Sequence, residues 1–546
     1  MRHLAWIGLG LIAGAAFITA CSSSSDEGSA SMMDGYPSGS AGSGGGTAGT
    51  GGSAVNMDGG TGYTGGSGGA GTAGSAGTAG TGEQGDENRP PEGVDAGEDA
   101  GEDAGFSCSD LDPATPEVLY LSTDDSNSMA SPTIARRIIN TQGGMVPGSI
   151  IRTYEFLNYY NVRYAPPEPG ALNIVPQMTP GAADTDMELQ IGVQAEDPAT
   201  PRRPMTLTFV LDTSGSMGGS PIQLEADTVR AVAASLRAGD IVSAVTWSTS
   251  NAVILSGHQV VGPNDPAILN LAGTISANGG TDLHGGLVAG YQLAEQHYGD
   301  NRINRMMLIS DGGANVGITD ENLIGEKADD ENKEGIYLVG VGVGDGLNDT
   351  LMNTVTDAGN GAYVYVDSAD EATKMFGGRF AETMDVAARA VQVKVTLPWY
   401  FQMYKFHGEQ YSGDPKKVKP QHLAPGDSMV FHQIVRACDA SEINGDDPME
   451  FAATWTDPFD YTEKTTSVAT TIDALLAGQI EALKRGRAIV AYAETLKLVS
   501  TQTVAERAVT IDAALSVVAE ADPSGTDPEL SEIKDLLTKY KQMVAQ

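Results

Sequence analysis

The sequence predicts an α/β protein whose central domain has a doubly wound, mostly parallel sheet. Apolar runs typical of buried strands alternate with segments of helical spacing between residues 203 and 390, as in folds whose parallel strands are joined by crossover helices. Polar loops follow several of these runs and carry the residues of a candidate site. A glycine-rich segment precedes the domain and residues 470–546 have helical spacing, so the chain divides into several parts.

The elements of the central domain are expected in the following order. Residues 207–211 form an apolar run suited to a buried strand, and residues 221–236 place apolar side chains at helical intervals. Residues 241–247 and 252–255 lie close together in the chain and predict an antiparallel pair at one edge of the sheet. Further strands are expected at 305–309, 336–343 and 362–366, and further helices at 283–296, 322–334, 348–357 and 370–390.

Five side chains with oxygen donors make up the candidate site: Asp212, Ser214, Ser216, Thr281 and Asp311. We expect each of their three segments to leave the end of a buried strand. Because the carboxyl ends of parallel strands meet at one edge of a sheet, the side chains would then converge where such folds bind ligands. Magnesium prefers octahedral oxygen ligands and keeps several waters. The sequence therefore predicts a Mg²⁺ site, with Mn²⁺ or Ca²⁺ as alternatives, that leaves one position for a partner's carboxylate.

Three other interpretations concern a helix cap, a catalytic nucleophile and a nucleotide-binding loop. The segment 212–216 taken alone could be a serine and aspartate cap at a helix N-terminus, but Thr281 and Asp311 favour an ion. Ser214 is not expected to be a nucleophile, because the Gly-x-Ser-x-Gly turn requires glycine where Asp212 stands. The glycines of segment 340–346 lack the helix-opening frame of a nucleotide-binding loop, so no nucleotide is expected.

The five site residues resemble the metal-ion-dependent adhesion site (MIDAS) of von Willebrand factor A domains. The flanking segments 135–139, 151–160, 164–168, 406–409 and 423–427 resemble those of bacterial YfbK-like von Willebrand A lipoproteins. The resemblance implies a Rossmann-like A domain at 203–390 between an N-terminal module at 108–200 and a β-rich module at 391–465. A C-terminal helical segment at 470–546 completes the expected domain order.

Two strands that flank the central domain predict how the other modules are built. Apolar residues alternate with other residues in segments 187–193 and 391–397, which is the pattern of half-buried strands. We expect these two strands to pair and, with segments 429–435 and 451–455, to form a small antiparallel sandwich into which the central domain is inserted. The helical stripe of the C-terminal segment is expected to pack on this sandwich, in preference to a membrane surface.

The N-terminal residues have the pattern of a targeting segment. Residues 1–20 combine a basic start with a short apolar stretch, and Cys21 stands where bacterial lipoproteins are cleaved and lipidated. An uncleaved anchor and an ordinary secretory signal are the alternatives. Residues 21–107 are rich in Gly, Ser and Ala and predict a disordered tether, about 50 Å from end to end as a flexible coil. The expected location is the cell envelope, lipid-anchored, with Ser22 favouring the outer membrane.

Two further cysteines, Cys108 and Cys438, remain once Cys21 is lipidated. In an oxidising envelope two remaining cysteines usually pair, so a disulfide is expected, and two unrelated buried thiols are the alternative.

Charge and residue content limit the classes of function that the sequence allows. The net charge of −39 excludes nucleic-acid binding through a basic surface. We expect no enzyme, but an envelope-tethered adhesion module that captures an Asp or Glu of a protein partner through Mg²⁺, with the membrane contacted through the lipid anchor alone. Two alternatives remain: a metal-bearing accessory subunit of an ATPase or chelatase-like assembly, and a hydrolase that uses the same ion to activate water.

Overall fold

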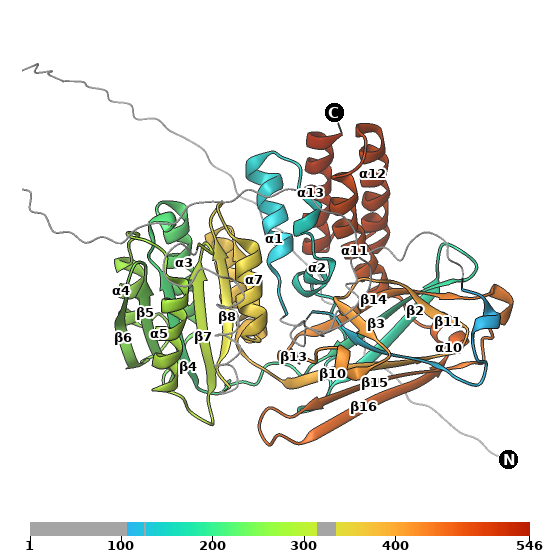
Figure 1. The fold of residues 1–546 in the computed structure, drawn as a ribbon, viewed down its shortest axis with the longest axis horizontal. Coiled ribbons are helices and arrows are strands. Elements are labelled where there is room, and N and C mark those ends of the chain that lie inside the picture. The colour runs from blue at the N-terminus through green and yellow to red at the C-terminus, as the bar shows by residue number, and fades with distance from the viewer. Residues whose placement is uncertain (1–105, 125–126, 314–334, 546) are drawn as a thin grey trace, which may run out of the picture. The chain divides into compact units, whose positions relative to one another are not determined.

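The computed structural model describes residues 106–124, 127–313 and 335–545, which all lie in the unit Asp86–Gln546. The described strands form three sheets (Figure 1). One sheet belongs to the central domain, and the other two form a sandwich. None of the described helices has the length and apolar character needed to cross a membrane.

The central domain contains a six-stranded sheet with the order β6-β5-β4-β7-β8-β9. Its strands are β4 (Met205–Asp212), β5 (Ile241–Trp247), β6 (Asn251–Gln259), β7 (Ile303–Ser310), β8 (Tyr337–Val343) and β9 (Tyr363–Val366). All neighbours are parallel except β5 and β6, so the predicted antiparallel edge pair is confirmed. The strand order reverses between β4 and β7, which makes their carboxyl ends the topological switch point of the sheet.

Helices cover both faces of this sheet. On one face lie α3 (Ser220–Ser235), α4 (Pro266–Thr274), α8 (Ala369–Thr373) and α9 (Phe380–Met384). On the other face lie α5 (Leu283–Glu295) and α7 (Asp349–Ala358). The helix expected at 322–334 falls outside the described residues.

The prediction of one helix over residues 370–390 is wrong. The segment contains α8, a π-helical turn at Lys374–Gly378 and α9, and it ends in the strand β10 (Ala388–Leu397). Gly377 and Gly378 have poor helix propensity and interrupt the apolar stripe. The central domain therefore ends before residue 388, where the chain joins the sandwich.

The sandwich is built from residues on both sides of the central domain. One sheet has the order β12-β1-β10-β15-β16, with β13 also paired to β10, and the other has the order β11-β14-β3-β2. The strands not yet defined are β1 (Glu117–Ser122), β2 (Asn173–Pro180), β3 (Asp186–Gln194), β11 (Phe401–Phe406), β12 (Gln410–Ser412), β13 (Gln421–Leu423), β14 (Ser428–Ala437), β15 (Pro448–Thr456) and β16 (Glu463–Thr471). The segments before and after the central domain thus form one body.

The expected pairing of segments 187–193 and 391–397 is wrong, although both segments are strands of the sandwich. β3 pairs with β2 and β14, whereas β10 pairs with β1, β13 and β15. Their apolar side chains share one core, where Leu189 and Ile191 of β3 are fully buried with Val393 and Val395 of β10. The two strands lie in different sheets because alternation determines which face of a strand is buried but does not determine its neighbour.

The C-terminal segment forms the helices α10 (Ile472–Leu476), α11 (Glu481–Val499), α12 (Val504–Ala521) and α13 (Pro528–Val544). α11 packs on the sandwich sheet, as predicted. Arg487 forms an ion pair with Glu188 of β3, and the backbone N–H of Leu483 donates to Gln177 of β2. The buried apolar residues of α11, α12 and α13 lie in a core that they share with α2 and the central domain, whereas Val509 of α12 is exposed.

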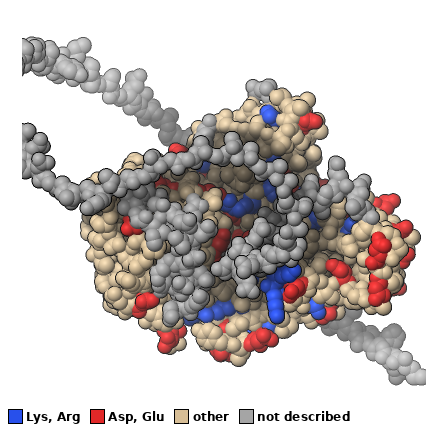
Figure 2. Space-filling model, in the orientation of Figure 1, with Lys and Arg blue, Asp and Glu red and all other residues tan. Residues whose placement is uncertain are grey.

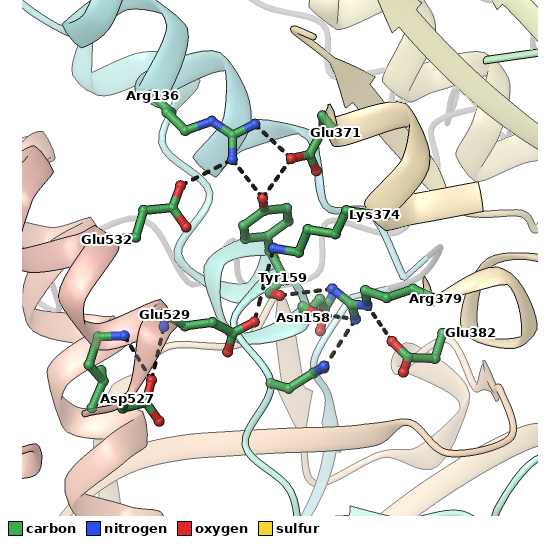
Figure 3. A network of polar contacts seen from close by, with 12 residues as sticks. Arg136, Asn158, Tyr159, Glu371, Lys374, Arg379, Glu382, Asp527, Glu529 and Glu532 are labelled. Atoms are coloured by element: carbon green, nitrogen blue, oxygen red, sulfur yellow. Dashed lines mark hydrogen bonds and ion pairs between the residues drawn. The ribbon is translucent and has the colours of Figure 1, made fainter. Parts of the chain in front are cut away.

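A buried polar network joins the central domain to helices at both ends of the chain (Figure 3). Arg136 of α1 (Ala130–Arg137) lies at its centre and forms ion pairs with Asp367, Glu371 of α8 and Glu532 of α13. The hydroxyl of Tyr159 in α2 (Thr153–Tyr159) accepts from Arg136 and donates to Glu371. The end of the central domain is thus held between N-terminal and C-terminal helices.

Candidate metal-binding site

Two of the five predicted residues follow directly from the strand order. Asp212 is the last residue of β4, and Asp311 follows the last residue of β7, its neighbour at the switch point. Both side chains are buried, with 0% and 6% of their surfaces exposed. The strands therefore place two carboxylates at the edge where parallel α/β sheets bind ligands.

The loop after β4 is held by hydrogen bonds to its own residues and to a second loop. The backbone N–H of Ser214 donates to Asp212 Oδ1 over 2.9 Å, and the hydroxyl oxygens of Ser214 and Ser216 lie 3.0 Å apart. The backbone N–H of Gly215 donates to the carbonyl of Gly279 over 3.0 Å. This bond draws the two loops together.

Thr281 reaches the site by a different route from the one expected. It lies in the connection between α4 and α5 and not at the end of a strand, and the helix α4 was not predicted. Gly279 in this connection has φ of +93°, a conformation that favours glycine. Thr281 follows this turn by two residues, and it is buried, with 2% of its surface exposed.

The position of Gly313 shows how closely the three segments converge. A Cβ atom built on Gly313 would lie 3.3 Å from Asp311 Oδ1, 3.4 Å from Thr281 Cγ2 and 3.8 Å from Ser216 Oγ. Side chains from all three segments therefore surround one point. Ser214 is hydrogen-bonded to both Ser216 and Asp212. All five predicted residues therefore form one cluster.

The cluster concentrates negative charge in a buried place. The pKa of Asp212 is raised to about 6, mainly by burial and also by the charge of Asp311, against hydrogen bonds from Ser310 and Ser214 that lower it. Burial also raises the pKa of Glu225 in α3 well above its usual value, and Asp212 adds to this, against the backbone N–H of Asp212. Among the described residues, neither side-chain oxygen of Glu225 has a partner with hydrogen-bond geometry.

Two of the residues that shape this site were missed in the sequence. The Ser310 hydroxyl donates to Asp212 Oδ2 over 2.6 Å and accepts from the N–H of Gly312 over 2.9 Å, so it orients the buried carboxylate. The position of Ser310 immediately before Asp311 in the sequence could have identified it. Glu225 stands three residues after Ile222 and four before Val229, so helical spacing places it on the apolar face of its helix. A carboxylate at that position could have identified it as a buried residue.

The donor chemistry suits a hard divalent cation. Two carboxylates and three hydroxyls are oxygen ligands of the kind that Mg²⁺ prefers. Within the described part of the chain, no group of three or more His, Cys, Asp and Glu side chains could hold a metal. A cation at this cluster would therefore depend on its serine and threonine hydroxyls.

The remaining predicted site residues lie elsewhere. Cys108 and Cys438 form a disulfide with Cα atoms 5.2 Å apart, which joins the start of the described chain to the end of β14. Cys21 is outside the described residues.

The fold and the cluster together define the class of protein. Residues 206–377 match the family described as von Willebrand factor type A domain. The chain thus contains a von Willebrand factor type A domain, and it is similar to the YfbK-like proteins that carry one.

The chain is similar to two curated proteins and to a solved structure. The chain is 27% identical over 313 residues to the uncharacterized protein YfbK of Escherichia coli K12, which covers 55% of this chain and 52% of that protein. It is 28% identical over 208 residues to the uncharacterized protein sll0103 of Synechocystis, covering 38% and 48%. The chain thus spans about half the length of these curated relatives. A solved von Willebrand factor type A structure from Catenulispora acidiphila aligns with a TM-score of 0.43 and 13% identity, over 68% of this chain and 95% of that one.

Proposed function

We propose that this protein is a metal-dependent binding module whose A domain captures an acidic residue of a protein partner through Mg²⁺. The observation that carries the proposal is the convergence of Ser216, Thr281 and Asp311 around the position of Gly313. These residues come from three separate loops, and their oxygen donors suit Mg²⁺. An A domain supports a role in protein interaction or adhesion.

Each residue of the cluster has a role in this proposal. The hydroxyls of Ser214, Ser216 and Thr281 hold the ion directly. Asp212 and Asp311 act through water or hydroxyl hydrogen bonds, as Asp212 already does with Ser310. With neutral direct ligands the ion keeps most of its positive charge, which it offers to an incoming carboxylate. Ser216 is exposed while Ser214 is buried, so a partner would approach from the side of Ser216.

We propose binding in preference to catalysis. A hydrolase would need a general base beside the ion, and the Asp212 carboxylate is already engaged by Ser310 and by the N–H of Ser214. Phosphatase or protease turnover that requires Mg²⁺ and is lost in Asp311→Ala would contradict this choice. An accessory role in an ATPase or chelatase-like assembly would require a cytoplasmic location, which the proposed envelope location opposes.

We further propose that the protein is anchored in the cell envelope by a lipid on Cys21, with residues 21–107 as a tether. The basic start, the apolar stretch and the position of Cys21 support this. Cys21→Ser should move the protein from membrane to soluble fractions. An unchanged distribution would contradict the lipid anchor and would leave the metal-dependent mechanism standing.

The test of the binding function combines metal titration with partner capture. Calorimetry with Mg²⁺ should give one site per chain in the wild type and none in Asp212→Ala or Asp311→Ala. Capture of proteins from envelope extracts should be lost with EDTA and in the same two variants. Asp512→Ala is the matched control, because Asp512 is an exposed carboxylate of α12 that pairs with Lys541. Capture that is insensitive to EDTA would reject the mechanism.

A further inference from the structure

A second site lies at the opposite, amino edge of the central sheet. A cavity of about 30 Å³ is lined there by Arg203, Arg302, Arg305 and Arg389, together with Asp300 and Asp385. Arg305 belongs to β7 of the central domain and Arg389 to β10 of the sandwich. Four arginines against two aspartates are unusual in a chain with a net charge of −39. On the face drawn in Figure 2, acidic side chains gather instead over the end of the sandwich that bears α10.

Arg305 is the most buried of these cations. Its surface is 6% exposed, and its guanidinium donates one hydrogen bond to a described residue, from Nη1 to the carbonyl of Asn304 over 2.9 Å. The pKa of Arg305 is lowered to about 10, mainly by burial and also by the charges of Arg203 and Arg389, against Asp385 and Tyr337, which raise it. The other N–H groups of this guanidinium have no acceptor among the described residues.

Arg389 is also left without a counter-charge. It forms no ion pair with a described carboxylate, and its Nε is buried without a hydrogen-bond partner. The nearby carboxylate of Asp385 bonds instead to Arg203, with 3.0 Å between Oδ1 and Nη2. A buried charge that lacks a partner is strongly destabilising. Arg305 and Arg389 therefore present positive charge to the cavity without an ion-pair partner among the described residues, which favours an anion there.

Aromatic rings lie beside both of these guanidiniums. Arg305 lies 5.1 Å from the ring centre of Tyr337, and Arg389 lies 5.1 Å from that of Tyr461. A cation–π contact of this kind does not use an N–H group as a hydrogen-bond donor to an oxygen. The N–H groups lie in the guanidinium plane, and that fork geometry matches the oxygens of carboxylates and phosphates.

From this arrangement we infer that the cavity binds one small inorganic oxyanion, of the phosphate or sulfate class, between Arg305 and Arg389. A cavity of this size holds about two or three waters, which is roughly the volume of one tetrahedral oxyanion and excludes nucleotides and larger ligands. Because the two arginines come from different parts of the fold, the bound anion joins the base of the A domain to the sandwich. The inference does not depend on the metal site.

The first test is anion binding to the full chain. Thermal unfolding is measured in a chloride buffer and then with inorganic phosphate or sulfate at constant ionic strength. A saturable rise in Tm of about 5 °C is expected at a hundredfold excess over the dissociation constant. Calorimetry should give one phosphate per chain. The absence of saturable binding, or an equal effect of chloride, would overturn the inference.

Two variants and a control locate the bound anion. Arg389→Gln should weaken phosphate binding at least tenfold, whereas Arg163→Gln, at a side chain that is 71% exposed, should leave it unchanged. Arg305→Met removes the buried charge at similar length. In phosphate-free buffer its Tm should equal or exceed that of the wild type, and phosphate should no longer raise it.

A large fall in Tm for Arg305→Met without phosphate would show that the protein itself satisfies this charge, and would reject the inference. Arg389→Gln is decisive by itself if Arg305→Met does not fold. Phosphate binding of wild-type strength in Arg389→Gln would equally reject the site.

Discussion

Arg136 provides the sharpest test of how the A domain is held. Its Nε and Nη2 bond to the two oxygens of Asp367 over 2.9 and 2.8 Å, and Nη2 also reaches Glu371 over 2.7 Å. The partners are as buried as Arg136 itself, because the side chain of Glu371 is 4% exposed and that of Asp367 is 12% exposed. In Arg136→Ala both carboxylates lose their main cation.

The expected loss of stability follows from burial. Breaking a buried ion pair by removing one partner costs about 3 to 5 kcal/mol, because the remaining charge stays uncompensated. Glu532 is 30% exposed and adds little to this loss. The control is Arg230→Ala, whose ion pair with Asp227 joins side chains that are 48% and 33% exposed, and it should cost less than about 0.5 kcal/mol.

Unfolding in guanidinium chloride, followed by circular dichroism, measures both variants. The double variant Arg136→Met with Glu371→Gln should lose less stability than the sum of its single changes, since one of the two carboxylates left without Arg136 is gone. A loss below about 1 kcal/mol in Arg136→Ala, or additive losses in the double variant, would refute the assignment of this network as a buried, coupled ion-pair cluster.

Three further predictions concern other parts of the fold. Replacing Cys108 and Cys438 by serine opens a loop of 330 residues, so urea unfolding should show a loss of about 2 to 5 kcal/mol, and a loss below 1 kcal/mol would contradict a stabilising disulfide. Gly290→Ala should cost about 1 to 3 kcal/mol by thermal unfolding, because its Cβ would lie 2.4 Å from Val210 Cγ2, whereas Gly273→Ala in α4 meets no atom within 4 Å and should not destabilise. Burial alone would raise the pKa of Glu188, but His432 and Arg487 lower it to about 2. The stability that Glu188 contributes is therefore present above pH 4.5 and lost as pH falls towards 2, so the stability difference between wild type and Glu188→Gln should shrink over that range, and a difference independent of pH would contradict it.

The strands of the central domain could be predicted because buried parallel strands are continuous apolar runs. Residues 207–211 lie within β4, and the polar residue that follows them, Asp212, stands at the carboxyl edge for that reason. The site residues that lie at the end of a strand could therefore be predicted from the sequence. Thr281 was identified by its order in the chain, and its connection to α4 was not foreseen.

The remaining features depend on contacts that periodicity does not encode. Alternation in β3 and β10 predicted two half-buried strands, but their neighbours depend on the whole sandwich. The arginine cavity was missed because Arg203, Arg305 and Arg389 are far apart in the sequence and only the insertion of the A domain into the sandwich brings them together.

That insertion also determines how the A domain transmits tension. The chain enters the domain beside Arg203 and leaves it beside Asp385, and these two side chains are bonded to each other at the amino edge of the sheet. Asp212 and Asp311 lie at the opposite edge. A force applied at that edge would run lengthwise along the parallel strands and leave through two covalent connections on one small area. Such a pull would load the strands in shear, and the ion pairs of Arg136 with Asp367 and Glu371 would share the load with the two connections.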